Sequence, residues 1–280
     1  MLHHLPDACQ AETAGGVMKL DYYDLISPSP FTIQGVGSIR PLTLREVSRL
    51  TGRIYSTYLA LLNISPEKYC TEVNESLKPW YENLNEEQLS CLTMYDIAVS
   101  SAALQQSFSA IFDFFFAERV MYDRAKDAFL VFSPVKDEEG NDSIRVTGTI
   151  HKGNYLEVCD TILQFGHIDT KDTVDPARVK NKKGLARYQE MQKRKKKNRI
   201  KPKTDTDLEL ANIISAVCAM HNSINYTNVW DMTVYQLWDT FARLRNNEIY
   251  ASGRTSVSVW GDKENKFDYN LWFKNITTTN

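Results

Sequence analysis

Side chains that could act as acids, bases or metal ligands are few and scattered in this sequence. The five histidines include His3 and His4 near the N-terminus and His221 at the end of an apolar stretch. The motifs of zinc peptidases, phosphate-binding loops and serine hydrolases are missing. We therefore expect no catalytic residues, no metal site and no cofactor, and we interpret the chain as a binding protein and not an enzyme.

Two short patterns could carry ligand chemistry, and each has a simpler explanation. Gly35 and Gly37 follow a predicted short strand, Phe31–Ile33, as a nucleotide-binding turn would. The third glycine of that fingerprint is missing, and Pro41 stands where its helix should run, so we predict a glycine turn. The acidic stretch 136–142 contains a glycine but lacks the spacing of a calcium-binding loop, which favours a solvated turn.

The strongest charge signal is the segment from Arg178 to Lys203. It contains thirteen Lys or Arg residues and one acid, Glu190, so the rest of the chain holds 20 basic and 34 acidic residues. Such a segment can neutralise nucleic-acid phosphates, dock on an acidic partner, or bind the acidic body of a second copy of the chain. A solvated basic loop explains the composition equally well. The residues expected to contact nucleic acid or an acidic partner are Lys193, Arg194, Lys195, Lys196, Lys197 and Arg199.

Large aromatic residues are concentrated toward the C-terminus, and together they form too large an apolar area to remain exposed to water. We expect this tail either to fold back on its own domain or to clip onto a partner. The predicted partner-binding residues are Trp230, Trp238, Phe241, Trp260, Trp272 and Phe273.

Two helices, 205–222 and 233 to about 246, are the clearest predicted elements. The first is apolar on nearly every face, so we expect a core helix that is covered all round. The second begins with a capping box, in which Thr233 and Gln236 satisfy backbone N–H groups at the helix start. Beyond it, residues 255–260 alternate as a strand would.

The N-terminal half predicts further helices from the same kind of signal. Thr43 with Glu46 forms a second capping box, and helix starts are also predicted at Ser65 and Asn85. A long apolar run over 93–126 is expected to be helical with at most one break. Residues 129–150 predict a β-hairpin and 155–165 a helix. The helix that begins after Thr43 is expected to continue past Gly52. Its inward face is expected to carry Val47, Leu50, Ile54, Tyr58, Leu61 and Leu62.

These elements predict a mainly α protein of the α+β class, with a multi-helix core, a small β-hairpin insertion and an irregular aromatic C-terminal tail. Whether the hairpin region is a separate subdomain is left open. The predicted segments are a disordered N-terminus 1–18, a helical region 19–127, a hairpin and helix region 128–175, a basic linker 176–204, a core helix pair 205–250 and an aromatic tail 251–280.

Composition places the chain among soluble globular proteins, with 42% hydrophobic and 24% charged residues among 280. No run approaches the roughly 20 apolar residues of a membrane span, and the N-terminus lacks the features of a secretory signal. We therefore expect no membrane contact and a cytoplasmic location. Five cysteines without a paired C-x-x-C spacing predict reduced thiols.

Several segments resemble proteins encoded in the tail modules of phages and prophages of Gram-positive bacteria. They are Ile26–Phe31 with Gly37–Arg40, then Ile213–Val217, and especially Trp230–Arg243 with Ser258–Gly261. The resemblance implies a tail-assembly protein of the chaperone class, which binds a tape-measure or tail-tube protein in the host bacterial cytoplasm. A tape-measure protein is a long helical chain whose apolar stripes need an amphipathic partner. The alternative hypothesis is a phage nucleic-acid-binding protein that uses residues 178–203.

Overall fold

The computed structural model describes residues 19–136, 142–168, 208–262 and 265–276. The fold is helix-dominated and of the α+β class, as predicted. The chain divides into two compact units. Unit 1 comprises residues 1–168 with 230–236, and unit 2 comprises 169–229 with 237–280. In the described part of the chain, no helix has the length and apolar character needed to cross a membrane.

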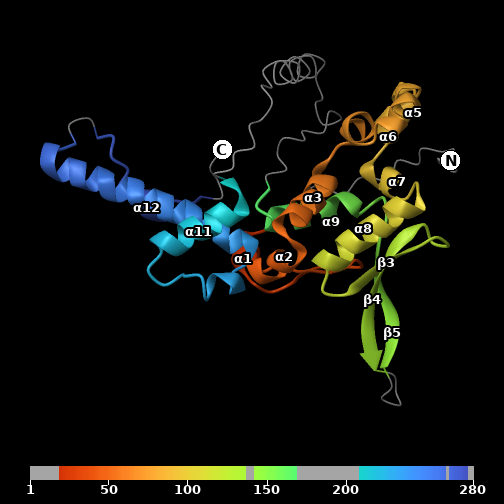
Figure 1. Cartoon of the computed structure of the whole chain (residues 1–280), viewed down its shortest axis with the longest axis horizontal. Coiled ribbons are helices and arrows are strands. Elements are labelled where there is room, and N and C mark those ends of the chain that lie inside the picture. The colour runs from red at the N-terminus through yellow and green to blue at the C-terminus, as the bar shows by residue number, and fades with distance from the viewer. Residues whose placement is uncertain (1–18, 137–141, 169–207, 263–264, 277–280) are drawn as a thin grey trace. The chain divides into compact units, whose positions relative to one another are not determined.

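Unit 1 combines short helices with two antiparallel sheets, and Figure 1 shows their order along the chain. Its elements are α1 (Tyr22–Ile26), β1 (Phe31–Ile33), β2 (Gly37–Ile39), α2 (Leu44–Leu50), α3 (Gly52–Asn63), α4 (Pro66–Lys68), a π-helical turn η1 (Tyr69–Val73), a 3-10 turn η2 (Glu75–Leu77), α5 (Lys78–Glu82), α6 (Glu86–Cys91), α7 (Met94–Ala98), α8 (Ala102–Phe115), β3 (Arg119–Asp123), β4 (Ala128–Lys136), β5 (Asp142–Ile150) and α9 (Tyr155–Phe165).

The predicted helix starts are confirmed because their capping chemistry is local. The Thr43 side chain accepts a hydrogen bond from the backbone N–H of Glu46, whose carboxylate accepts one from the backbone N–H of Thr43. Asn85 and Gln88 form the same reciprocal pair at α6. Ser65 caps α4 with a proline at the first helical position.

The helix predicted to run through Gly52 is interrupted at Thr51. This residue has φ 71°, a left-handed conformation that a β-branched residue rarely adopts, and it separates α2 from α3. The break shifts the helical phase, so the buried face of α3 carries Tyr55, Leu59 and Leu62. The expected inward position of Ile54 is wrong, because this side chain is exposed.

The apolar run over 93–126 does not continue as helix to its end. Helix α8 stops at Phe115, and Arg119–Asp123 forms β3, so the helical prediction is wrong there. The Asp113 carboxylate at the end of α8 accepts hydrogen bonds from the Arg119 side chain and the Val120 backbone N–H. These contacts turn the chain into the sheet, whose strand order is β3-β4-β5. The predicted hairpin, β4 with β5, is confirmed.

An aromatic cluster forms the core of unit 1 between α7, α8, α9 and the three-stranded sheet. The ring of Phe112 lies 5.2 Å from that of Phe129 and 6.1 Å from that of Tyr155, both edge-on. Tyr95 completes the cluster and donates a hydrogen bond of 2.6 Å to the Asp127 carbonyl. The Tyr155 hydroxyl is buried without a hydrogen-bond partner and lies against the Cys159 thiol. Burial raises the pKa of Tyr155 well above its usual value.

The glycine turn between β1 and β2 is confirmed, and it packs on the sheet at close range. Gly35 has φ 75°, and its carbonyl accepts a hydrogen bond from the backbone N–H of Thr149 in β5. A Cβ on Gly148 would lie 2.0 Å from the Val36 carbonyl oxygen. Only glycine therefore permits this approach, which closes part of the outer edge of β5.

Unit 2 contains α11 (Leu210–Met220) and most of the 27-residue α12 (Val234–Trp260), and ends with the 3-10 turn η7 (Leu271–Phe273). The turn η6 (Val229–Asp231) precedes α12. The prediction that the first helix is covered all round is wrong, since only Ile213, Ile214 and Val217 are buried. The strand-like reading of 255–260 is also wrong, because α12 continues to Trp260.

The cysteines follow the prediction only in part. Cys70, Cys159 and Cys218 are free, and burial raises the pKa of each thiol. Cys91 is disulfide-bonded, so the expectation of a reduced thiol is wrong at that position.

Candidate interaction site

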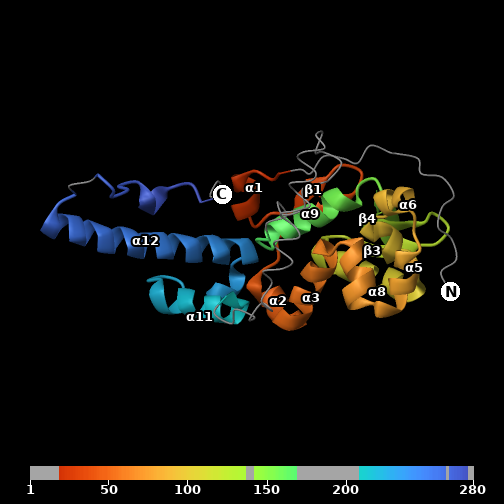
Figure 2. The ribbon, with the colours of Figure 1, turned by 90° about the horizontal axis from the view of Figure 1, so that it is seen from above.

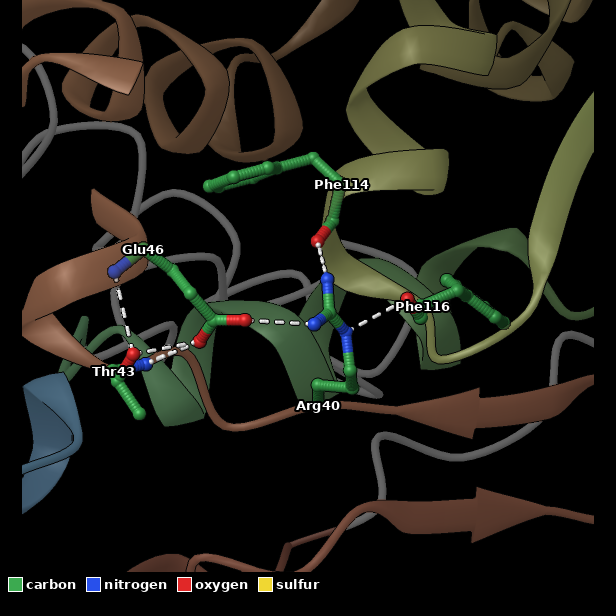
Figure 3. A network of polar contacts seen from close by, with 5 residues as sticks. All are labelled: Arg40, Thr43, Glu46, Phe114 and Phe116. Carbon is green, nitrogen blue, oxygen red and sulfur yellow. Dashed lines mark hydrogen bonds and ion pairs between the residues drawn. The ribbon is translucent and has the colours of Figure 1, made fainter. Parts of the chain in front are cut away.

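Arg40 connects the end of α8 to the start of α2 in unit 1 (Figure 3). Its guanidinium donates from Nε to the Phe116 carbonyl and from Nη2 to the Phe114 carbonyl, both at 2.9 Å. Phe114 lies in the last turn of α8 and Phe116 is its C-cap residue, so neither carbonyl group has a partner within the helix. The Nη1 atom lies 2.7 Å from Glu46 Oε1, in the capping box of α2.

The surroundings of the Glu46 carboxyl group lower its pKa. Burial raises its pKa, but the hydrogen bonds from the Thr43 backbone and hydroxyl, together with the Arg40 guanidinium, outweigh burial and lower the pKa overall. The carboxylate form is therefore part of the folded structure.

The capping box of α2 pairs with the capping box of α12. Thr43 and Thr233 form an antiparallel bridge, flanked by hydrogen bonds from the Leu44 N–H to the Met232 carbonyl and from the Val234 N–H to the Leu42 carbonyl. The predicted box of Thr233 and Gln236 is present at 2.9 and 3.1 Å. The start of α12 is therefore held by side chains and backbone at once.

Beyond Trp260 the chain turns back and runs along α12, a segment that we call the return, residues 265–276 (Figure 2). Gly261 has φ 73° and ends the helix. The Asp262 carboxylate then accepts hydrogen bonds from the backbone N–H groups of Lys266 and Phe267, at 2.9 and 3.1 Å. This local turn fixes the direction of the return.

Two contacts hold the return on the helix. The Phe267 ring occupies the space above Gly253, where a Cβ would come within 2.6 Å of Phe267 Cε2, and it lies 5.4 Å from the Tyr250 ring. Farther along, Arg243 Nη1 donates to the Lys274 carbonyl at 2.7 Å. The tail thus folds back on its own unit, which was one of the two predicted alternatives.

The return leaves several aromatic side chains in solvent. Trp260 is 77% exposed, while Trp272 and Phe273 are 53% and 54% exposed and stack edge-on with ring centres 4.9 Å apart. We call these three residues, with the exposed Tyr269, the aromatic surface. It extends along α12, because Lys274 lies beside Arg243 whereas Trp260 ends the helix about 25 Å farther on. Each ring is a large apolar area held on an ordered backbone.

The other predicted partner-binding residues are packed more fully. Trp238 and Phe241 are half-buried and form an edge-on pair at 6.1 Å, and Trp230 is also half-buried. Trp230 falls in unit 1, whereas the others fall in unit 2. Sequence reasoning did not single out the packing of Phe267 on Gly253; a glycine within a helix, followed by the Gly261-Asp262 turn, was the available signal.

The predicted nucleic-acid contacts, Lys193, Arg194, Lys195, Lys196, Lys197 and Arg199, lie outside the described residues. Among the residues that are described, no three His, Cys, Asp or Glu side chains gather in a way that could hold a metal ion. His221 Nδ1 accepts hydrogen bonds from the backbone N–H groups of Ser223 and Ile224 and so shapes the turn after α11.

The C-terminal part of the chain is similar to one known protein family. Residues 195–277 are similar to a domain of a phage protein, which suggests a phage relation for this part of the chain. The domain is the second domain of YomV, a protein of Bacillus phages and prophages. The match includes α11, α12 and the return, but it covers less than half of the chain. No curated protein and no solved structure matches.

Proposed function

We propose that this chain is a non-catalytic phage assembly protein that binds another polypeptide through the aromatic surface of unit 2. The carrying observation is that Trp260, Trp272 and Phe273 stay more than half exposed although the return folds onto α12. Aromatic side chains on an ordered backbone lose little conformational entropy on binding and dominate binding energy at protein interfaces.

The partner we propose is a tail protein, either the tape-measure or the tail-tube protein of the same phage, met in the host bacterial cytoplasm. The similarity to a YomV domain supports a phage setting for the region that carries the aromatic surface. A tape-measure protein offers long apolar helical stripes, which exposed Trp and Phe rings can cover. Membrane binding forms no part of this proposal.

The test uses the full chain with purified tape-measure and tail-tube proteins from the same phage. We expect one of them to bind, and the combined change Trp260→Ser, Trp272→Ser and Phe273→Ser to weaken binding at least about tenfold, since each lost anchor costs on the order of 1 kcal/mol or more. Tyr23→Ala is the matched control, because Tyr23 is an exposed aromatic residue of unit 1.

The nucleic-acid alternative is separated in the same experiment. Neutralising Lys193 to Lys197 is expected to leave tail-protein binding unchanged. Binding of DNA that disappears with this neutralisation, together with no binding of either tail protein, would replace the proposed function by the alternative.

A further inference from the structure

Thr51, between α2 and α3, has a backbone conformation that its residue type rarely adopts. Its φ of 71° with ψ of 139° lies outside the regions favoured for L-residues. Thr43 shows the ordinary alternative at the start of α2, with φ −76° and a side chain that accepts a hydrogen bond from the Glu46 N–H. The Thr51 side chain makes no such bond at the start of α3, so no cap compensates the strain. We call Thr51 with the following Gly52 the joint.

On one side of the joint, α2 is attached to the start of α12. The Leu44 N–H donates to the Met232 carbonyl at 2.9 Å, and the Arg45 guanidinium lies 2.8 Å from the Asp231 carboxylate. Backbone strain persists only where the surrounding structure imposes it. The contacts of α2 with the start of α12 are one half of that constraint.

On the other side of the joint, α3 is attached to the core of unit 1. The Tyr55 ring lies 6.2 Å from the Phe115 ring of α8. A Cβ on Gly166, at the end of α9, would lie 3.2 Å from Leu59 Cδ1, so α9 packs closely on α3. The joint therefore connects a helix that follows the start of α12 to a helix that belongs to the core.

Helix α3 carries a second apolar face beside the one that it buries. Ile54 is 42% exposed, and Tyr58 and Leu61 are half-buried. In one continuous helix these three side chains would align, at spacings of three and four residues, with Val47 and Leu50 of α2. The bend at the joint removes this alignment. The sequence therefore fits a straight helix through the joint as well as the bent pair.

We infer that α2 and α3 form a two-state element, bent at the joint in this structure and straight in a less populated second state. Straightening relieves the strain at Thr51 and turns α2, with the start of α12, relative to α3. Arg40 stays on α8, because two of its hydrogen bonds go to carbonyl groups there, and its ion pair with Glu46 is the contact that opens. The element thus changes the direction in which α12 begins while the core stays folded.

A zinc site built across the joint tests for the straight state. Two histidines four residues apart on one helix face bind zinc together, so Arg49→His with Arg53→His forms a site when residues 49–53 are helical. Arg53→His with Thr57→His is the matched control within α3, and all three positions are exposed. In zinc titrations of the full chain, against the parental background, we expect the pair across the joint to bind about 10- to 1,000-fold more weakly than the control pair. A state populated at about 0.1–10% weakens the apparent affinity by that fraction.

Two single changes should move the equilibrium in opposite directions. Thr51→Gly relieves the strain of the bent state and should weaken zinc binding across the joint about fivefold. Glu46→Gln keeps a capping-box residue but removes the ion pair of the bent state, and it should strengthen this binding about two- to fivefold. Neither change should alter zinc binding by the control pair.

Hydrogen exchange gives an independent measurement. The N–H groups of residues 52–54 begin α3 and have no partner within it, whereas a straight helix would bond them to the carbonyl groups of residues 48–50. Zinc bound across the joint should therefore slow exchange of these three amides. No zinc binding above the parental background, zinc binding that Thr51→Gly leaves unchanged, or unchanged exchange of these amides would each overturn the inference. Each of these results would leave the proposed function untouched, because the aromatic surface takes no part in the assay.

Discussion

Replacing Arg40 by alanine tests whether one side chain joins α8 to α2. The change removes two hydrogen bonds to carbonyl groups at the end of α8 and the ion pair with Glu46. The Arg40 side chain is 35% exposed, so we take about 1.5 kcal/mol for each hydrogen bond, the low end for a charged donor, and at most about 1 kcal/mol for the ion pair. We expect Arg40→Ala to lower the free energy of unfolding by about 3–4 kcal/mol.

Two variants make the reasoning specific. Arg40→Lys keeps the charge but has no planar fork to reach two carbonyls, so about half of the loss should remain. Arg45→Ala is the matched control, because Arg45 lies in α2 and its ion pair with Asp231 is exposed on both sides. That variant should cost less than about 1 kcal/mol.

The assay is urea unfolding of the full chain, with hydrogen exchange of the α8 amides reporting on unit 1. Hydrogen exchange is needed because a chain with two units need not unfold in one step. If Arg40→Ala lowered the free energy of unfolding no more than Arg45→Ala does, Arg40 would not hold the end of α8 as inferred. So would unchanged exchange at the end of α8.

The remaining predictions concern pH, backbone strain, buried hydroxyls and the return. Because the pKa of Glu46 is lowered by folding, its contribution is present above the ordinary pKa of about 4.3 and is lost as pH falls through the folded value; Glu46→Gln should remove this part of the acid sensitivity in pH-dependent unfolding. Thr51→Gly should raise the free energy of unfolding by about 1 kcal/mol by relieving the left-handed strain, and an unchanged or lower stability would contradict it. Tyr155→Phe should be neutral or stabilising because its hydroxyl has no partner, whereas Tyr95→Phe should cost about 1 kcal/mol through its lost hydrogen bond; equal thermal shifts would disprove the distinction. Gly253→Ala should displace the aromatic ring that packs there and speed hydrogen exchange in the return, an effect that alanine at the exposed Ser256 should not produce.

The features that could be read from the sequence are those whose cause lies within a few residues. Each capping box, such as Thr43 with Glu46, satisfies backbone groups three positions away, so the pattern contains the whole interaction. The glycine turn and the β4–β5 hairpin follow from residues next to one another. The break at Thr51 was missed because nothing local requires a left-handed threonine there.

The sequence pointed to the aromatic residues of the candidate site, but it did not predict which of them stay exposed. Exposure of Trp260, Trp272 and Phe273 depends on the path of the return, which is set by the non-local contact of Phe267 with Gly253. The same aromatic pattern would have been consistent with complete burial.

The distal half of α12 explains both the failed strand prediction and the presence of the return. Residues 251–260 include glycine, serines, a threonine and valines, which together disfavour helix by about 4 kcal/mol relative to alanine. The hydroxyls of Thr255 and Ser258 bond back to carbonyls one turn earlier and do not link the helix to other elements. Such a segment stays helical only when other groups pack on it. The return supplies that packing along one side, so the turn that folds the tail back also keeps Trp260 on an ordered helix end, where a partner can reach it.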